Sequence, residues 1–125
     1  MSVITQVNDL ADLLRFEGEH RYSRERATLS AGHNLMLGTV VATDTATGKI
    51  APLDPVDTSS LAEATGVLLN DCDATAADNP DALVGVRHAI VLRDALIWPA
   101  VITAEQKAAA IAQLRKLGIL VRDAV

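Results

Sequence analysis

After residue 26 the apolar residues come in short runs separated by Gly, Pro, Asp and Asn, and this pattern limits what the chain can fold into. Short apolar runs bounded by turn-forming residues predict strands of a few residues each. One longer segment, residues 104–117, is instead rich in Ala, Gln, Leu, Lys and Arg, which favour helix. The predicted fold class is therefore α+β and mostly β, in one small domain.

The predicted strands share apolar or hydroxylic residues between turn signals. They are residues 27–31, 38–43, 49–53, 64–69, 83–93 and 119–122. Residues 44–48 are turn-rich and end in Gly, so they predict a hairpin between the second and third strands. Pro52 cannot donate to a sheet ladder, which predicts that its strand lies at an edge. Residues 70–81 are polar and acidic, and we expect a loop there.

The helix predicted over 104–117 has local signals at both ends. Thr103 is a suitable N-cap, and Gln106 three residues later completes a capping-box pattern. Gly118 suits the position that follows a helix. In the predicted strand 83–93, strict alternation would place His88 on the apolar face with Val84 and Val86.

Residues 1–26 differ from the rest of the chain. Val3, Val7, Leu10 and Leu14 have helical spacing, which predicts a short amphipathic helix. Seven of the twelve residues in 15–26 are charged, with mixed signs, so this part buries little apolar surface by itself. Two interpretations remain: a solvated tail, or an arm that becomes ordered on a partner.

The composition restricts both the core and the partners. Half of the 125 residues are hydrophobic, yet only three are aromatic, so the core must be built from Ala, Val, Leu and Ile. The net charge is -5, and no basic cluster follows residue 26. Nucleic-acid binding is therefore disfavoured.

The compartment is predicted from Cys72 and from the longest apolar run. A single Cys cannot form an internal disulfide, which favours a reducing compartment during folding. The N-terminus has no basic start followed by an apolar run, as a signal peptide would. The run over 95–102 is too short to span a bilayer and contains Pro99. We expect a soluble protein made in the cytosol.

No motif predicts catalysis, a metal or a cofactor. The stretch that begins at Asp71 lacks the Gly and Glu of a calcium loop, and residues 47–50 lack the rest of a phosphate loop. His20, His33 and His88 have no metal-ligand spacing, and we expect His88 to be packed and hydrogen-bonded. Acidic neighbours should raise the pKa of Cys72, which disfavours a nucleophile. A small-molecule binding domain or hydrolase that uses His88, Asp94 or Cys72 remains an alternative.

Several segments, taken in order, resemble the bacteriophage head decoration protein family, the lambda-type capsid stabilisers. The N-terminal signature lies in Tyr22, Ser23, Arg24 and Glu25, residues 28–32, Leu35, residues 38–40 and residues 47–49. Later matches are residues 64–68, 86–91, 96–99 and 114–121. The family more usually has Gly where His88 stands. The resemblance covers roughly residues 20–122.

The resemblance implies a structural virion protein and no enzyme. Such proteins bind as homotrimers to the outer surface of the expanded head at local threefold positions. There they clamp the major capsid protein against the pressure of packaged DNA. The resemblance implies no cofactor, nucleic acid, membrane or small-molecule partner. It places the protein in the host cytoplasm before assembly. Another trimeric structural protein of the phage, from the tail or a fibre, remains an alternative.

The predicted division of the chain is a capsid-binding arm, 1–26, and a β-rich body, 27–125. The resemblance leaves the trimer contacts unassigned. The predicted arm contacts are Phe16, Arg21, Tyr22, Ser23, Arg24 and Glu25.

Overall fold

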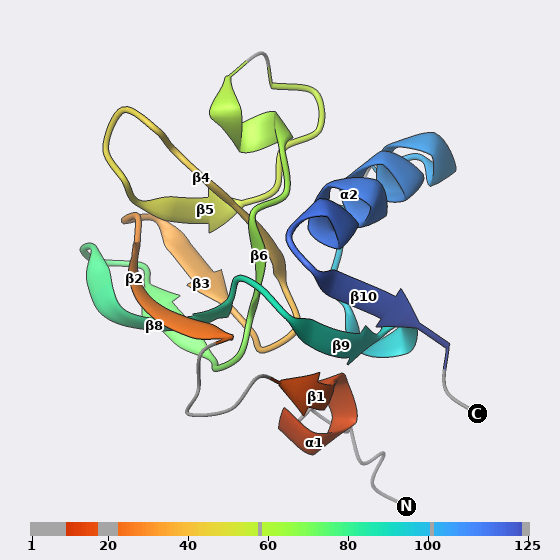
Figure 1. Ribbon diagram of the computed structural model, residues 1–125. Coiled ribbons are helices and arrows are strands. Elements are labelled where there is room, and N and C mark those ends of the chain that lie inside the picture. The colour runs from red at the N-terminus through yellow and green to blue at the C-terminus, as the bar shows by residue number, and fades with distance from the viewer. Residues whose placement is uncertain (1–9, 18–22, 58, 101, 124–125) are drawn as a thin grey trace, which may run out of the picture.

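A closed barrel of five short strands forms one half of the molecule (Figure 1). The computed structural model describes residues 10–17, 23–57, 59–100 and 102–123. In order around the barrel, the strands are β2 (Arg24–Leu29), β5 (Ile50–Pro52), β4 (Val40–Thr43), β6 (Gly66–Leu68) and β8 (Asn79–Gly85). The antiparallel pair β2–β8 is the longest, whereas β2 meets β5 only at the parallel pair Leu29↔Ile50.

A three-stranded sheet with a helix beside it forms the other half. Its strands, in order, are β1 (Leu14–Glu17), β9 (Ala89–Leu92) and β10 (Ile119–Arg122). The helix α2 (Ala104–Lys116) connects β9 to the parallel strand β10. A single turn of helix, α1 (Leu10–Leu13), leads into β1. Two 3-10 turns, η2 (Ser60–Ala62) and η3 (Arg93–Ala95), and a two-stranded sheet of β3 (His33–Leu35) and β7 (Cys72–Ala74) complete the fold.

The predicted fold class, late helix and final strand are confirmed. Thr103 Oγ1 accepts a hydrogen bond from the Gln106 amide at 3.1 Å, and Gln106 Oε1 accepts one from the Thr103 amide at 2.9 Å. This reciprocal capping fixes the start of α2 where the sequence predicts it. The hairpin over 44–48 is also confirmed, because Gly48 donates to the Asp44 carbonyl between β4 and β5.

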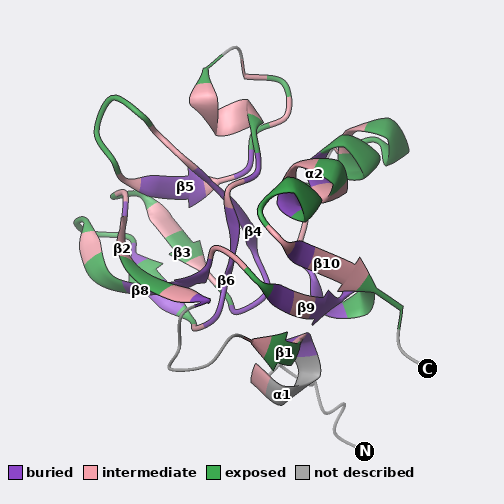
Figure 2. Cartoon of the chain, viewed as in Figure 1, coloured by how far each residue is buried: buried purple, intermediate pink, exposed green. Residues whose placement is uncertain are grey.

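Two aliphatic cores meet at β4 and β6 (Figure 2). Val40 and Val67 face the first core, which lies toward α2 and the three-stranded sheet. Val41 and Leu68, the next residue along each strand, face the second core inside the barrel. Both faces of these strands are therefore buried, and each fully buried aliphatic side chain stabilises the fold by about 1.5–3 kcal/mol. The prediction of an aliphatic core is confirmed.

The strand predicted over 83–93 is wrong as a single element. It is divided into β8 and β9 by a break at residues 86–88. His88 has a φ of 49°, the one positive φ among the described residues other than Gly. A left-handed residue ends the alternation of a strand. His88 is therefore exposed at the surface beside Gly118 instead of packed on an apolar face.

Three other predictions about strands need correction. The loop predicted over 70–81 contains β7, whose partner β3 was also missed. The strand predicted to start at residue 27 begins at Arg24. The strand of Pro52 is not an edge, because β5 pairs with both β4 and β2. Pro52 is tolerated there since it lies beyond the single residue pair with β2.

The helix predicted from the N-terminal spacing is described only in part. Leu10 lies in α1, but Leu14 is already in β1. Val3 and Val7 lie outside the described residues. Within the part of the chain that the structure describes, no helix has both the length and the apolar character that a bilayer span requires.

Replacing His88 by Gly should raise the free energy of unfolding by about 0.5–1 kcal/mol, because Gly adopts a positive φ without a Cβ clash. Urea unfolding of the wild type and His88→Gly measures this difference. His88→Ala is the matched control, since it removes the ring but keeps the backbone strain. If His88→Gly is no more stable than His88→Ala, the proposed cause is wrong.

Candidate functional site

The segment expected to carry the site lies against the body through β1. This strand pairs antiparallel with β9, with Phe16 opposite Ile90 and Glu17 opposite Ala89. Leu13, just before β1, is fully buried in the first core. Phe16 is 57% exposed, so a large apolar side chain is presented to solvent from a strand that is itself anchored. The described part of the segment is therefore ordered on its own chain.

Ser23 fixes the point where the chain joins the barrel. Its side chain is buried, and Ser23 Oγ donates to the His88 carbonyl at 2.8 Å. Its own carbonyl accepts from the Val86 amide at 2.9 Å. Ser23 therefore satisfies backbone groups of the first and the last residue of the break between β8 and β9. Arg21 and Tyr22, the residues before it in the predicted site, lie outside the described residues.

Arg24 connects β2 to β1. Its Nε and Nη2 donate to the two carboxylate oxygens of Glu17, each at 2.6 Å. The two side chains are only 16% and 25% exposed. The hydrogen bonds from Arg24 to Glu17 raise the pKa of the guanidinium, against the opposing effect of burial. A bidentate, largely buried pair is among the stronger ion pairs in proteins.

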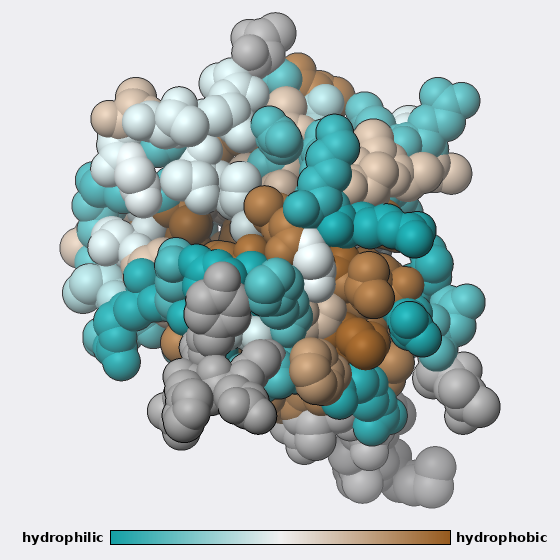
Figure 3. Space-filling model, in the orientation of Figure 1, coloured by the Kyte–Doolittle hydropathy of each residue, from teal (hydrophilic) through white to brown (hydrophobic). Residues whose placement is uncertain are grey.

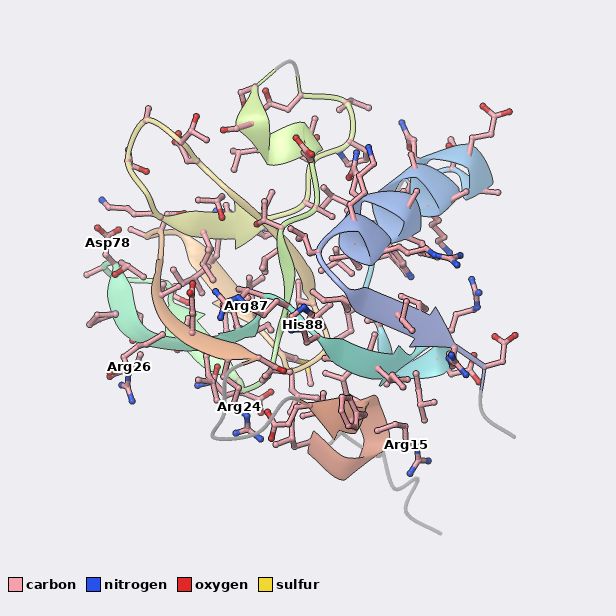
Figure 4. All side chains as sticks on the ribbon, in the orientation of Figure 1. Arg15, Arg24, Arg26, Asp78, Arg87 and His88 are labelled. Carbon is pink, nitrogen blue, oxygen red and sulfur yellow. The ribbon has the colours of Figure 1, made fainter. Side chains whose placement is uncertain are left out.

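The next two charged residues of β2 pair with the strand β8 and the turn that follows it. Glu25 forms an ion pair with Arg87, and Arg26 forms a more exposed one with Asp81. Figure 4 shows Arg24 and Arg26 pointing outward from β2, with Arg87 toward the middle of the molecule. Two of the charged residues that the sequence assigns to an arm, Glu25 and Arg26, are therefore paired with residues of the body.

The acidic segment between β6 and β8, which contains β7, is also held by contacts within the protein. Asp71 accepts a hydrogen bond from the Leu37 amide, and Asp73 accepts from Thr75. Asp78 pairs with Lys49 at 2.6 Å, and that hydrogen bond lowers the pKa of its carboxyl. No group of three or more His, Cys, Asp or Glu able to hold a metal occurs among the described residues. The carboxylates serve as structural acceptors.

An apolar row crosses the outer face of the three-stranded sheet. Phe16 on β1, Ile90 on β9 and Leu120 on β10 are register partners. Ile90 and Leu120 are half-buried, and Figure 3 shows apolar surface over this part of the molecule. The sequence analysis singled out Phe16 but missed its two neighbours. The only signal for them is the strand register, which the sequence does not contain.

The residues of the catalytic alternative lie on separate elements. Cys72 is buried in β7, His88 lies in the break after β8, and Asp94 lies in η3. An apolar depression of about 240 Å³, beside Met36 and Trp98, contains none of the three. Burial, with smaller effects of Asp81 and Asp73, raises the pKa of the Cys72 thiol, as the sequence predicts. A protonated, buried thiol is a poor nucleophile.

Comparison with known protein families shows which family this chain belongs to. A family model described as bacteriophage lambda head decoration protein D matches residues 3–119. The chain belongs to this head decoration family. None of the curated proteins matches it. This match confirms the resemblance found in the sequence. A head decoration protein is a structural component of the phage capsid.

The backbone at residue 88 has the conformation that Gly most readily adopts. The resemblance predicts Gly at this position in related decoration proteins. The positive φ of His88 is the conformation that Gly adopts most readily. In this chain the left-handed residue between β8 and β9 carries a side chain.

We expect the Cys72 thiol of this decoration protein to react slowly with a thiol reagent. At pH 8 the native protein should react at least about tenfold more slowly than in urea, because burial limits access and disfavours the thiolate. A colorimetric thiol assay measures both rates. Equal rates in buffer and urea would show that Cys72 is accessible in the native state.

The Arg24–Glu17 pair should contribute about 1 kcal/mol of coupling energy to folding. A double-mutant cycle with Arg24→Gln and Glu17→Gln, followed by urea unfolding, measures this coupling. The Arg26–Asp81 pair, whose side chains are 71% and 73% exposed, is the matched control and should couple by about 0.5 kcal/mol or less. Equal coupling in both cycles would contradict the importance assigned to Arg24.

Proposed function

We propose that this decoration protein binds as a homotrimer to the outer surface of the expanded phage head, at local threefold positions, and stabilises the shell against the pressure of packaged DNA. Its partners are two further copies of itself and the major capsid protein. The family match over residues 3–119 carries the proposal. Before assembly the protein would be in the host cytoplasm. The proposed role requires no catalysis, cofactor or nucleic acid.

We assign capsid binding to the N-terminal arm, residues 1–26. Phe16 supports this assignment, because it is a large apolar side chain exposed on the edge strand of a sheet. Edge strands have unpaired backbone groups that can bind an extended partner segment, which tolerates mixed and polar side chains. In the proposed trimer three arms would bind together, so modest contacts combine into strong attachment.

The body suits a rigid spacer on the outside of a shell. The barrel strands β4 and β6 also pack into the first core against β9 and β10, so the two halves cannot move independently without opening that core. The net charge of -5 gives no attraction to DNA, which the proposed position would leave on the other side of the shell.

Phe16→Ala in the full chain should reduce binding to expanded heads lacking decoration protein by tenfold or more, about 1.4 kcal/mol per site. Cosedimentation across a range of protein concentrations measures the affinity. Val56→Ala is the matched control, because Val56 is also exposed, at 72%, but lies in the loop after β5. Its binding should equal that of the wild type.

A different experimental result would contradict each part of the proposal. Equal binding of Phe16→Ala and Val56→Ala would remove Phe16 from the contact. Electron microscopy of decorated heads that placed the density away from threefold positions, or as single copies, would overturn the proposed geometry. A wild-type chain that binds no head would overturn the function.

A further inference from the structure

The positive side chains of the described residues fall into two groups. Five of them form ion pairs within the described chain, and these are Arg24, Arg26, Lys49, Arg87 and Arg93. The five that form no ion pair with a described residue all lie on β1, α2 and β10, and they are Arg15, Lys107, Arg115, Lys116 and Arg122. Although the net charge is -5, the positive charge left unpaired among the described residues is gathered around the three-stranded sheet.

Two of these unpaired cations line a hollow between α2 and β10. The hollow has a volume of about 150 Å³ and is lined by Ile111, Arg115, Leu120, Val121 and Arg122. Arg115 and Arg122 are both exposed at the surface. A guanidinium binds a carboxylate through two parallel N–H donors, so two of them around one small hollow favour an acidic side chain. Ile111 and Leu120 provide apolar contact for the methylene groups of such a side chain.

The hollow adjoins the apolar row on the outer face of the sheet. Leu120 belongs to both, and its register partner Ile90 pairs in turn with Phe16. Arg122 shares a face with Leu120, because side chains two residues apart on a strand point the same way. Arg15 precedes Phe16 on the antiparallel strand β1, so it lies toward the same end of β9 as Arg122. Figure 4 shows the Arg15 side chain pointing outward, away from Arg24.

We propose that this face binds an acidic segment of the major capsid protein, whose carboxylate enters the hollow between Arg115 and Arg122. An apolar side chain of the same segment packs on the row of Phe16, Ile90 and Leu120. This inference rests on the proposed function, because it gives the chemistry of the partner that Phe16 contacts. Charge complementarity carries it, since the unpaired cations attract an acidic partner that the rest of this acidic protein repels. The apolar row beside the cations favours a protein segment over a polyphosphate.

Arg115→Gln with Arg122→Gln in the full chain tests the carboxylate site. Both residues are exposed, so the fold should tolerate the change. The matched control is Lys107→Gln with Lys116→Gln, which also removes two unpaired positive charges but from outside the hollow. Cosedimentation with expanded heads lacking decoration protein, at low and at high salt, measures the affinity and its dependence on salt.

We expect the arginine double variant to bind at least tenfold more weakly than the wild type at low salt, and to lose less affinity at high salt. The lysine double variant should bind within twofold of the wild type. Equal binding of the two double variants would overturn the acidic partner while leaving the proposed function and the contact of Phe16 in place. If the wild type binds no head, the proposed function fails, and this inference fails with it.

Arg122→Lys identifies the occupant of the hollow. A water-soluble carbodiimide joins a Lys amine to a contacting carboxylate as an amide, whereas it does not couple a guanidinium. Mass spectrometry of treated, decorated heads should show residue 122 joined to an Asp or Glu of the major capsid protein. A link from residue 122 to a second copy of this chain, or no link at this residue, would overturn the inference. Loss of self-association by the arginine double variant, measured by sedimentation of the free protein, would also overturn it, because a second copy would then occupy the hollow.

Discussion

The fold depends on two short strands that are buried on both faces. β4 and β6 direct alternate side chains into two different cores, so each strand belongs to the barrel and to the α2 side of the molecule at once. Such strands can bear no polar side chain on either face, which accounts for the uninterrupted apolar residues Val40–Val41–Ala42. Only three residues of the chain are aromatic, so both cores are built largely from aliphatic side chains, and β4 and β6 contribute to each of them.

The sequence predicts those elements whose signals are local. The helix α2 was predicted because Thr103 and Gln106 cap it within four residues, and the hairpin between β4 and β5 because its turn residues are contiguous. The strands β3 and β7 have three residues each and mixed polarity, and they form because they pair with each other across the chain. The break before β9 was invisible to periodicity, since Val86 and His88 continue the alternation of the preceding residues.

The sequence predicted which residue types form the candidate site, but not where the fold places them. The density of charge in residues 15–26 and the aromatic Phe16 among them were evident from the sequence, whereas the exposure of Phe16 was not. The opposite charges that allow Arg24, Glu25 and Arg26 to lie in a strand come from Glu17, Arg87 and Asp81. Two of these partners are more than fifty residues away, so local composition favoured an unstructured segment where a strand forms.

The pairing of β1 with β9 and of β2 with β8 has a consequence for synthesis. Both N-terminal strands are made before their partners: about seventy residues separate Glu17 from Ala89, and about fifty separate Leu29 from Asn79. At about 5–20 residues per second, translation exposes the N-terminal strands for roughly 2.5–14 s before these partners are made. Unpaired strands can associate with other nascent chains, and charged residues beside them oppose this. The charges of Glu17, Arg24, Glu25 and Arg26 would oppose such association before these residues form ion pairs in the folded protein.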